Sequence, residues 1–170
     1  MHDMADDPQT VLAVFAEAVR ALLQDKELRY ANPAERAIVG RLAHMIAGKF
    51  DGWSIDIEWN RREDVIKKLP YDLSDEELKE QGAIVPDLIV HRVGKRENLL
   101  VVEVKKVSNR DFAGDIWKLQ GMTDTGGNYG YAAGLHLVVD MAAGRVPQCD
   151  VYIDGSLQED LTDWMRGQLP

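Results

Sequence analysis

Apolar residues recur along this chain with two periods, one typical of helices and the other of strands. Helical spacing over residues 8–24 follows an Asp-Pro pair that is typical of a helix start. The same spacing predicts helices over about 32–49, 115–123 and 157–168. Residues 28–31 are expected to be a connection between the first two helices.

Five shorter runs carry the signature of β-strands. Residues 53–61 alternate strictly between apolar and polar, whereas 85–93, 98–107 and 131–141 contain longer apolar runs, and 149–153 is a short extra candidate. The helix between the third and fourth runs predicts that these two strands lie parallel through a crossover. The pattern therefore predicts an α/β fold whose central mixed sheet has four to five strands and is flanked by helices.

With 170 residues, the chain is expected to form a single domain spanning 1–170. The expected core covers about 32–141, with the helix over 8–24 and the C-terminal strand and helix as additions. Residues 62–82 form a charged insertion, in which a capping box predicts a short acidic helix.

Composition narrows the class of protein. Hydrophobic residues make up 45% of the chain and charged residues 29%, as in ordinary soluble globular proteins. The single cysteine, Cys149, leaves no pair for an internal disulfide and no cysteine-based zinc site. The acidic N-terminus lacks the apolar core of a signal peptide, and the longest apolar stretch, over 131–143, is too short for a membrane span. These features predict a cytoplasmic protein with no membrane association.

Two neighbouring strands, joined by a short polar loop with glycine, predict a β-hairpin. If Arg92 pairs with Asn98, the antiparallel ladder places Asp87 opposite Glu103. Lys105, two residues after Glu103, then projects from the same face. Opposed carboxylates on a largely buried sheet repel each other, and a divalent cation between them removes the conflict.

The same residues carry a resemblance to a known family. Pro86-Asp87, followed after fifteen residues by Glu103-Val104-Lys105, resembles the motif of the PD-(D/E)xK nuclease superfamily. The position of these residues on two strands of one hairpin strengthens the resemblance. It implies a restriction-endonuclease-like fold with a three-layer core.

The resemblance also implies an activity and a set of roles. The chain would be a metal-dependent nuclease that hydrolyses phosphodiester bonds, with DNA as the expected substrate. Asp87, Glu103 and the backbone carbonyl of Val104 would hold Mg²⁺ or Mn²⁺, and Lys105 would contact the attacking water or the scissile phosphate. Nucleases of this size often act as dimers or within larger assemblies, so a homodimer is expected by analogy.

Two further residues have alternative interpretations. The family often places an acidic residue of the first core helix at the metal, which would be Glu35, but Asn32 and Glu35 also form a capping box. The family often places a basic residue on the helix after the second strand near the phosphate. Lys118 fits that role, but it equally fits an ordinary solvated helix lysine.

Polar residues on other strands have simpler expected roles. Asp56, His136 and Asp140 are expected on solvent-exposed faces of their strands. His91 shares the face of Asp87, so it either lines the cleft or lies incidentally near the end of the hairpin.

Charge leaves the function open. The net charge of −9 disfavours a general polyanion binder. Residues 91–110, however, hold six basic residues against two acidic ones, a net +4, which suits either a phosphate-facing surface or a solvated sheet edge. Two other functions therefore stay open: a binding or assembly module that keeps the nuclease-like fold without catalysis, and an unrelated interaction domain in which Asp87, Glu103 and Lys105 do not converge.

Overall fold

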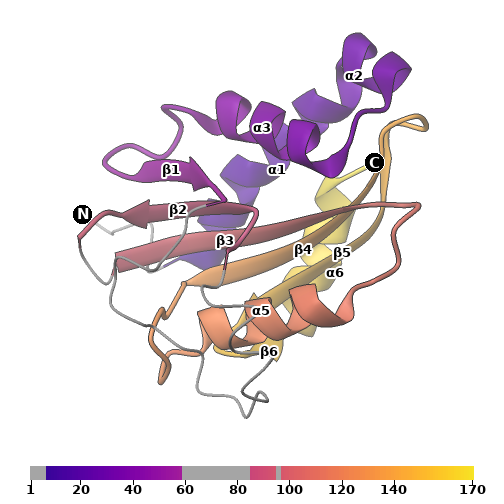
Figure 1. Ribbon diagram of the computed structural model, residues 1–170. Coiled ribbons are helices and arrows are strands. Elements are labelled where there is room, and N and C mark those ends of the chain that lie inside the picture. The colour runs from indigo at the N-terminus through magenta and orange to yellow at the C-terminus, as the bar shows by residue number, and fades with distance from the viewer. Residues whose placement is uncertain (1–6, 59–84, 95–96) are drawn as a thin grey trace.

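A six-stranded mixed sheet forms the centre of the protein (Figure 1). The computed structural model describes residues 7–58, 85–94 and 97–170. The predicted insertion over 62–82, with its capping box, and the end of the strand predicted over 53–61 lie outside these residues. The strands follow each other in chain order: β1 (Ser54–Ile57), β2 (Leu88–Arg92), β3 (Glu97–Lys106), β4 (Ala133–Asp140), β5 (Arg145–Ile153) and β6 (Ser156–Leu157).

The predicted crossover is confirmed, because β3 and β4 pair in parallel while every other neighbouring pair is antiparallel. The sheet has six strands rather than the four or five expected. The sixth is β6, because Asp154 and Gly155, both with positive φ, turn the chain back so that β6 pairs with the end of β5. The short strand predicted over 149–153 is longer than expected, because β5 begins at Arg145 and runs along most of β4.

Five helices surround the sheet in the described part of the chain: α1 (Pro8–Gln24), α2 (Lys26–Ala31), α3 (Glu35–Ile46), α5 (Ala113–Thr123) and α6 (Glu159–Gln168). The predicted start of α1 is confirmed, since the Asp7 side chain accepts a hydrogen bond from the Gln9 amide. The expected connection over 28–31 is instead helical, because the Asp25 side chain caps α2. Within the described ranges, no helix has the length and apolar character needed to cross a bilayer.

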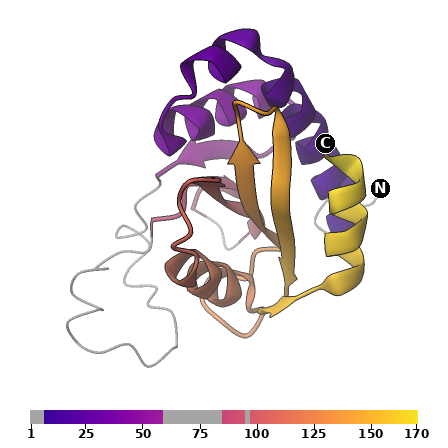
Figure 2. The same ribbon diagram turned by 90° about the vertical axis from the view of Figure 1, so that its right-hand side faces the viewer.

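The helices lie in layers on the two faces of the sheet, with α5 and α6 on opposite sides of β4 and β5 (Figure 2). Alternate residues of β3 divide between two apolar clusters: Leu100, Val102 and Val104 pack with α1 and α3, whereas Val101 packs with Leu119 of α5. Glu103 and Lys105 have the parity of Val101, so they lie on the face that α5 covers. The candidate residues of β3 therefore lie between the sheet and α5.

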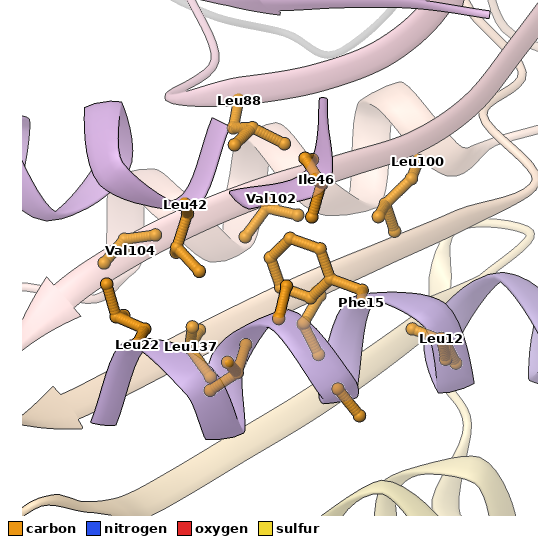
Figure 3. Close-up of a cluster of buried hydrophobic side chains, with 14 of the residues drawn as sticks. Leu12, Phe15, Leu22, Leu42, Ile46, Leu88, Leu100, Val102, Val104 and Leu137 are labelled. Carbon is orange, nitrogen blue, oxygen red and sulfur yellow. The ribbon is translucent and has the colours of Figure 1, made fainter. Parts of the chain in front are cut away.

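The larger cluster forms between α1, α3 and the opposite face of the sheet. Phe15 points from α1 toward Ile46 and Val102 at its centre (Figure 3), and its side chain is fully buried. This packing fixes the sheet from the side away from α5.

The outer edge of β5 is closed by groups from α6. The Thr162 hydroxyl accepts a hydrogen bond from the Val151 amide at 2.9 Å, and the Arg166 guanidinium donates to the Cys149 carbonyl at 2.9 Å. These side chains satisfy backbone groups that β6 does not reach, since β6 pairs only with the last two residues of β5.

Gly134 of β4 lies where α5 packs tightly against the sheet. A methyl group there would lie 2.8 Å from Cγ2 of Thr123, whose hydroxyl is held by a 2.7 Å hydrogen bond to the Leu119 carbonyl. We expect Gly134→Ala to lower the free energy of unfolding by about 1–3 kcal/mol in urea denaturation. Gly40→Ala is the control: its added methyl group meets nothing within 4 Å in α3. We expect it to stabilise the protein by about 0.5–1 kcal/mol, and equal effects at the two glycines would contradict the close contact.

Candidate active site

The hairpin of β2 and β3 differs at its tip from the sequence-based expectation. The expected pairing of Arg92 with Asn98 is wrong: Arg92 pairs with Glu97, and Asn98 pairs with His91. The Arg92 guanidinium binds the Glu97 carboxylate and lies 3.9 Å from the centre of the Trp53 ring. Both contacts stabilise the observed register at the tip.

A β-bulge after Val90 shifts the register by one residue below the tip. Leu88, the first residue of β2, therefore lies opposite Val102. The same register places Asp87, the residue before Leu88, opposite Glu103, the residue after Val102. The expected juxtaposition of the two carboxylates is present, although it arises through a bulge that the sequence analysis did not include.

Two carboxylates continue the hydrogen bonding of β3 beyond the start of β2. Oδ2 of Asp87 accepts a hydrogen bond from the Val104 amide at 2.8 Å, and Oε1 of Glu35 accepts one from the Lys106 amide at 3.1 Å. The N–H and C=O groups of one strand residue point to the same side of the strand. The Val104 carbonyl is therefore directed to the side on which Asp87 lies.

The capping box predicted for Glu35 is wrong. Ala34 is the N-cap of α3, and Asn32 ends α2 in a left-handed conformation with φ of 42°. The Glu35 carboxylate instead binds the Lys106 amide and, at 3.2 Å, the Asn109 side chain. Glu35 thus joins α3 to the end of β3.

Glu35 and Asp87 also line one small pocket of about 160 Å³ between α3 and the hairpin. Arg36 and Glu58 form its rim and pair with each other at 3.1 Å. The structure therefore brings Glu35 to the Asp87 side of the site, as a metal-site role requires, although its Oε1 atom is already engaged by two donors.

Glu103 is the most buried acid of the site, with 1% of its side chain exposed. Its Oε1 atom lies 3.2 Å from Nζ of Lys118 but has no hydrogen-bond partner of suitable geometry among the described residues. Burial raises the pKa of Glu103 well above its ordinary value, the nearby Asp87 raises it further, and Lys118 opposes the change. The protein thus holds a carboxylate where ionisation is costly, which is typical of functional sites.

Lys118 is not a freely solvated helix lysine. Besides its ion pair with Glu103, its ammonium donates a hydrogen bond to the Val85 carbonyl at 3.4 Å. Burial lowers the pKa of Lys118, but the negative charge of Glu103, with those of Asp87 and Asp115, outweighs this and raises it overall. Lys118 therefore remains charged and supplies the positive charge nearest to Glu103. A phosphate contact by Lys118 stays a prediction.

Lys105 lies on the same face but has a different partner. Its Nζ atom is 3.5 Å from Oδ2 of Asp115 in the first turn of α5, and the same oxygen is 3.2 Å from Nε2 of His136. The expected exposure of His136 is wrong, because α5 covers this face and Asp115 provides a buried partner. Asp115 was not among the predicted site residues. Its spacing from Leu119 and Met122, which places all three on one helix face, was a signal that could have indicated it.

His91 lies at the other end of the hairpin. It is buried, and its Nε2 atom is 2.6 Å from Oδ2 of Asp56, which is partly shielded rather than fully solvated as expected. His91 is four residues from Asp87 along the chain, so it belongs to the hairpin end and not to the Asp87–Glu103 pair.

The residues at the hairpin base suit a hard divalent cation. Asp87, Glu103 and the Val104 carbonyl are oxygen donors of the kind that Mg²⁺ and Mn²⁺ bind. The buried Oε1 atom of Glu103 has no hydrogen-bond partner among the described residues, and the cation now nearest to it is the Lys118 ammonium at 3.2 Å. The described ranges contain no group of three or more His, Cys, Asp or Glu side chains placed to bind a metal. The fit therefore depends on two carboxylates and a backbone carbonyl.

Comparison with models of known protein families finds no match for this chain, and a search of curated proteins finds no significant match.

The metal-free protein is expected to lose stability as the pH rises, because the pKa of Glu103 in the folded state lies above its ordinary value of 4.5. The folded state then binds a proton more tightly than the unfolded state, and this contribution is lost as the pH passes upward through the folded-state pKa. Asp87→Asn removes one cause of the raised pKa. In the presence of a chelator at pH 8, it is expected to raise the free energy of unfolding by roughly 0.5–1 kcal/mol.

Urea denaturation of the wild type and of Asp87→Asn between pH 5 and pH 8 measures this difference. Asp111→Asn, at an exposed position before α5, controls for the loss of one negative charge. A difference between wild type and Asp87→Asn that does not change with pH would contradict the coupling of Asp87 to Glu103.

Proposed function

We propose that this chain is a metal-dependent nuclease with a restriction-endonuclease-like fold, which hydrolyses phosphodiester bonds in DNA. The observation that carries the proposal is the juxtaposition of Asp87 with the buried Glu103 where β2 begins, with Lys105 on the same face of β3. The α/β architecture, with helices on both faces of a mixed sheet, supports the fold assignment.

Asp87, Glu103 and the Val104 carbonyl would hold Mg²⁺ or Mn²⁺, with Glu35 as a further candidate ligand beside Asp87. When bound, such an ion supplies Lewis-acid charge neutralisation and a water molecule of lowered pKa. The hydrogen bond from the Val104 amide fixes the Asp87 carboxylate. Fixed ligands lower the reorganisation needed for catalysis.

The two lysines would act on the phosphate and on water. Lys105 carries its ammonium on the face of Glu103, where it would orient the attacking water or stabilise charge that develops on the phosphate oxygens. Lys118 lies on α5, with its ammonium 3.2 Å from Oε1 of Glu103, and would contact the phosphate. Because both lysine side chains are partly buried, their charges act in a medium less polar than water, which strengthens their electrostatic interactions.

The net charge of −9 favours a second candidate, a binding or assembly module that keeps this fold without cleaving nucleic acid. Such a module has no need for a metal at Glu103. Metal binding and cleavage therefore distinguish the two functions.

The test is to titrate Mg²⁺ and Mn²⁺ into the wild type and Glu103→Ala by calorimetry, and then to incubate each with single-stranded DNA, double-stranded DNA and RNA. Metal-dependent cleavage by the wild type alone supports the nuclease and identifies its substrate form. Metal binding that depends on Glu103, without cleavage of any of these substrates, supports the metal site but contradicts nuclease activity on them. Metal binding that is absent or equal in the two proteins favours the non-catalytic module.

A further inference from the structure

A cluster of charged and polar groups lies beside the Asp87–Glu103 pair, and two of its members, Asp115 and His136, have no role in the proposed metal site. It consists of Asp115 on α5, Lys105 on β3 and His136 on β4. One oxygen, Oδ2 of Asp115, lies 3.5 Å from the Lys105 ammonium and 3.2 Å from Nε2 of His136. A single helix carboxylate thus connects two adjacent strands.

The position of this cluster relates it to the candidate active site. His136 pairs directly with Glu103 in the parallel ladder, and Lys105 follows Glu103 by two residues. Asp115 precedes Lys118, the partner of Glu103, by three residues on α5, so both side chains lie on one side of the helix. The cluster therefore borders Glu103 from both its neighbouring strand and the covering helix.

The burial of these groups is costly if they serve only to pack α5. The side chain of Asp115 is 9% exposed and that of His136 is fully buried, on a sheet face whose other residues include Ile89 and Val101. Apolar residues at such positions are often as stabilising as a buried ionic group. A cost of this kind is expected where the charge has a function.

His136 fixes the carboxylate in turn. An ionised carboxylate can only accept hydrogen bonds, so Nε2 of His136 is the donor in this contact with Asp115. The imidazole packs edge-on against Phe112, with 4.9 Å between ring centres, and this contact holds its orientation. Nδ1 has no hydrogen-bond partner among the described residues, so the donation to Asp115 is the polar contact that the structure gives to this ring.

We propose that Asp115, held by His136, is a positioning residue that fixes the Lys105 ammonium on the face of β3 that carries Glu103. The inference rests on the proposed nuclease function, in which Lys105 contacts water or the scissile phosphate. An ammonium has three protons, so one directed to Asp115 leaves two for the substrate. Fixing a long flexible side chain before the reaction removes an entropic cost that otherwise falls on the transition state.

The experiment compares Asp115→Asn, Lys105→Ala and the double variant with the wild type in steady-state cleavage of DNA. Asp115→Asn keeps the shape of the side chain but removes its charge. We expect it to lower kcat by about 10- to 30-fold with little change in KM or in metal affinity. In the Lys105→Ala background, the same substitution is expected to have no further effect. Asp111→Asn, an exposed acid before α5, is the matched control and is expected to behave as the wild type.

His136 provides a rescue test. His136→Gln keeps a side-chain N–H donor for Asp115 and is expected to retain most of the activity, whereas His136→Leu is expected to resemble Asp115→Asn. A purely structural role predicts instead that Asp115→Asn lowers activity equally in both backgrounds, in proportion to its loss of stability. That result would overturn the positioning role.

A second readout needs no cleavage. The rate at which an amine-reactive reagent modifies Lys105, followed by mass spectrometry, is expected to rise several-fold in Asp115→Asn and to stay unchanged in Asp111→Asn. An unchanged rate in Asp115→Asn would overturn the inference even if the wild type cleaves DNA. A raised rate in a protein that cleaves no nucleic acid would support the Asp115 contact and contradict the proposed function.

Discussion

Replacing Glu103 with glutamine is expected to reduce metal-dependent cleavage by roughly 10³-fold or more, because the amide has no negative charge with which to hold the cation. The fold should survive, since glutamine has the same shape and removes a carboxylate whose pKa is raised by burial. Initial rates on labelled DNA at saturating Mn²⁺ measure the loss.

Glu97→Gln is the matched control for Glu103→Gln. Glu97 begins the same strand, but its side chain is 44% exposed and pairs with Arg92 at the hairpin tip. The Glu97→Gln variant is expected to cleave DNA at the rate of the wild type. Similar losses in both variants would indicate that β3 is sensitive to any change of charge and would contradict a specific role for Glu103.

Replacing Phe15 with alanine is expected to lower the free energy of unfolding by about 3–5 kcal/mol, since the cavity left by the ring lies in the centre of the larger core. For a domain of this size, such a loss corresponds to a fall in melting temperature of roughly 10 °C. Calorimetry measures both quantities.

Tyr30→Ala is the control for Phe15→Ala, because the Tyr30 ring on α2 is 94% exposed. Its effect is expected within about 0.5 kcal/mol of zero. A small effect at Phe15 would show that α1 packs only loosely on the sheet.

The sequence predicted those elements whose signals are local. The Asp7 cap and the apolar repeat after it were sufficient for α1, and the helix between β3 and β4 was sufficient for their parallel pairing. The helix α2 was missed, because its six residues are too few to show a repeat.

The register of the hairpin shows where local signals fail. The pairing assumed for Arg92 was wrong by one residue, and the bulge after Val90 restored the level of Asp87 and Glu103. A bulge depends on contacts across the sheet, here including that of Arg92 with Trp53, which lies just before β1 and far from the hairpin in the sequence.

The sequence predicted that Asp87 and Glu103 lie at one level and that Lys105 shares the face of Glu103, but it did not predict the residues around them. The sequence around Glu35 matches a capping box, but in the structure its carboxylate binds the Lys106 amide of β3. Only the tertiary fold creates this contact. The alternation of apolar and polar residues along its strand predicted that His136 faces solvent. The layer formed by α5 changes that assignment, because it covers this face and places Asp115 against the imidazole.

The closed edge of β5 limits how two copies of this chain can associate. Many proteins join through unpaired strand edges that continue one sheet into a neighbour. Here a second copy arriving at β5 would have to displace Thr162 from the Val151 amide and Arg166 from the Cys149 carbonyl before any new ladder formed. If this protein forms a homodimer, its two-fold axis is therefore expected to pass through a surface other than the outer edge of β5.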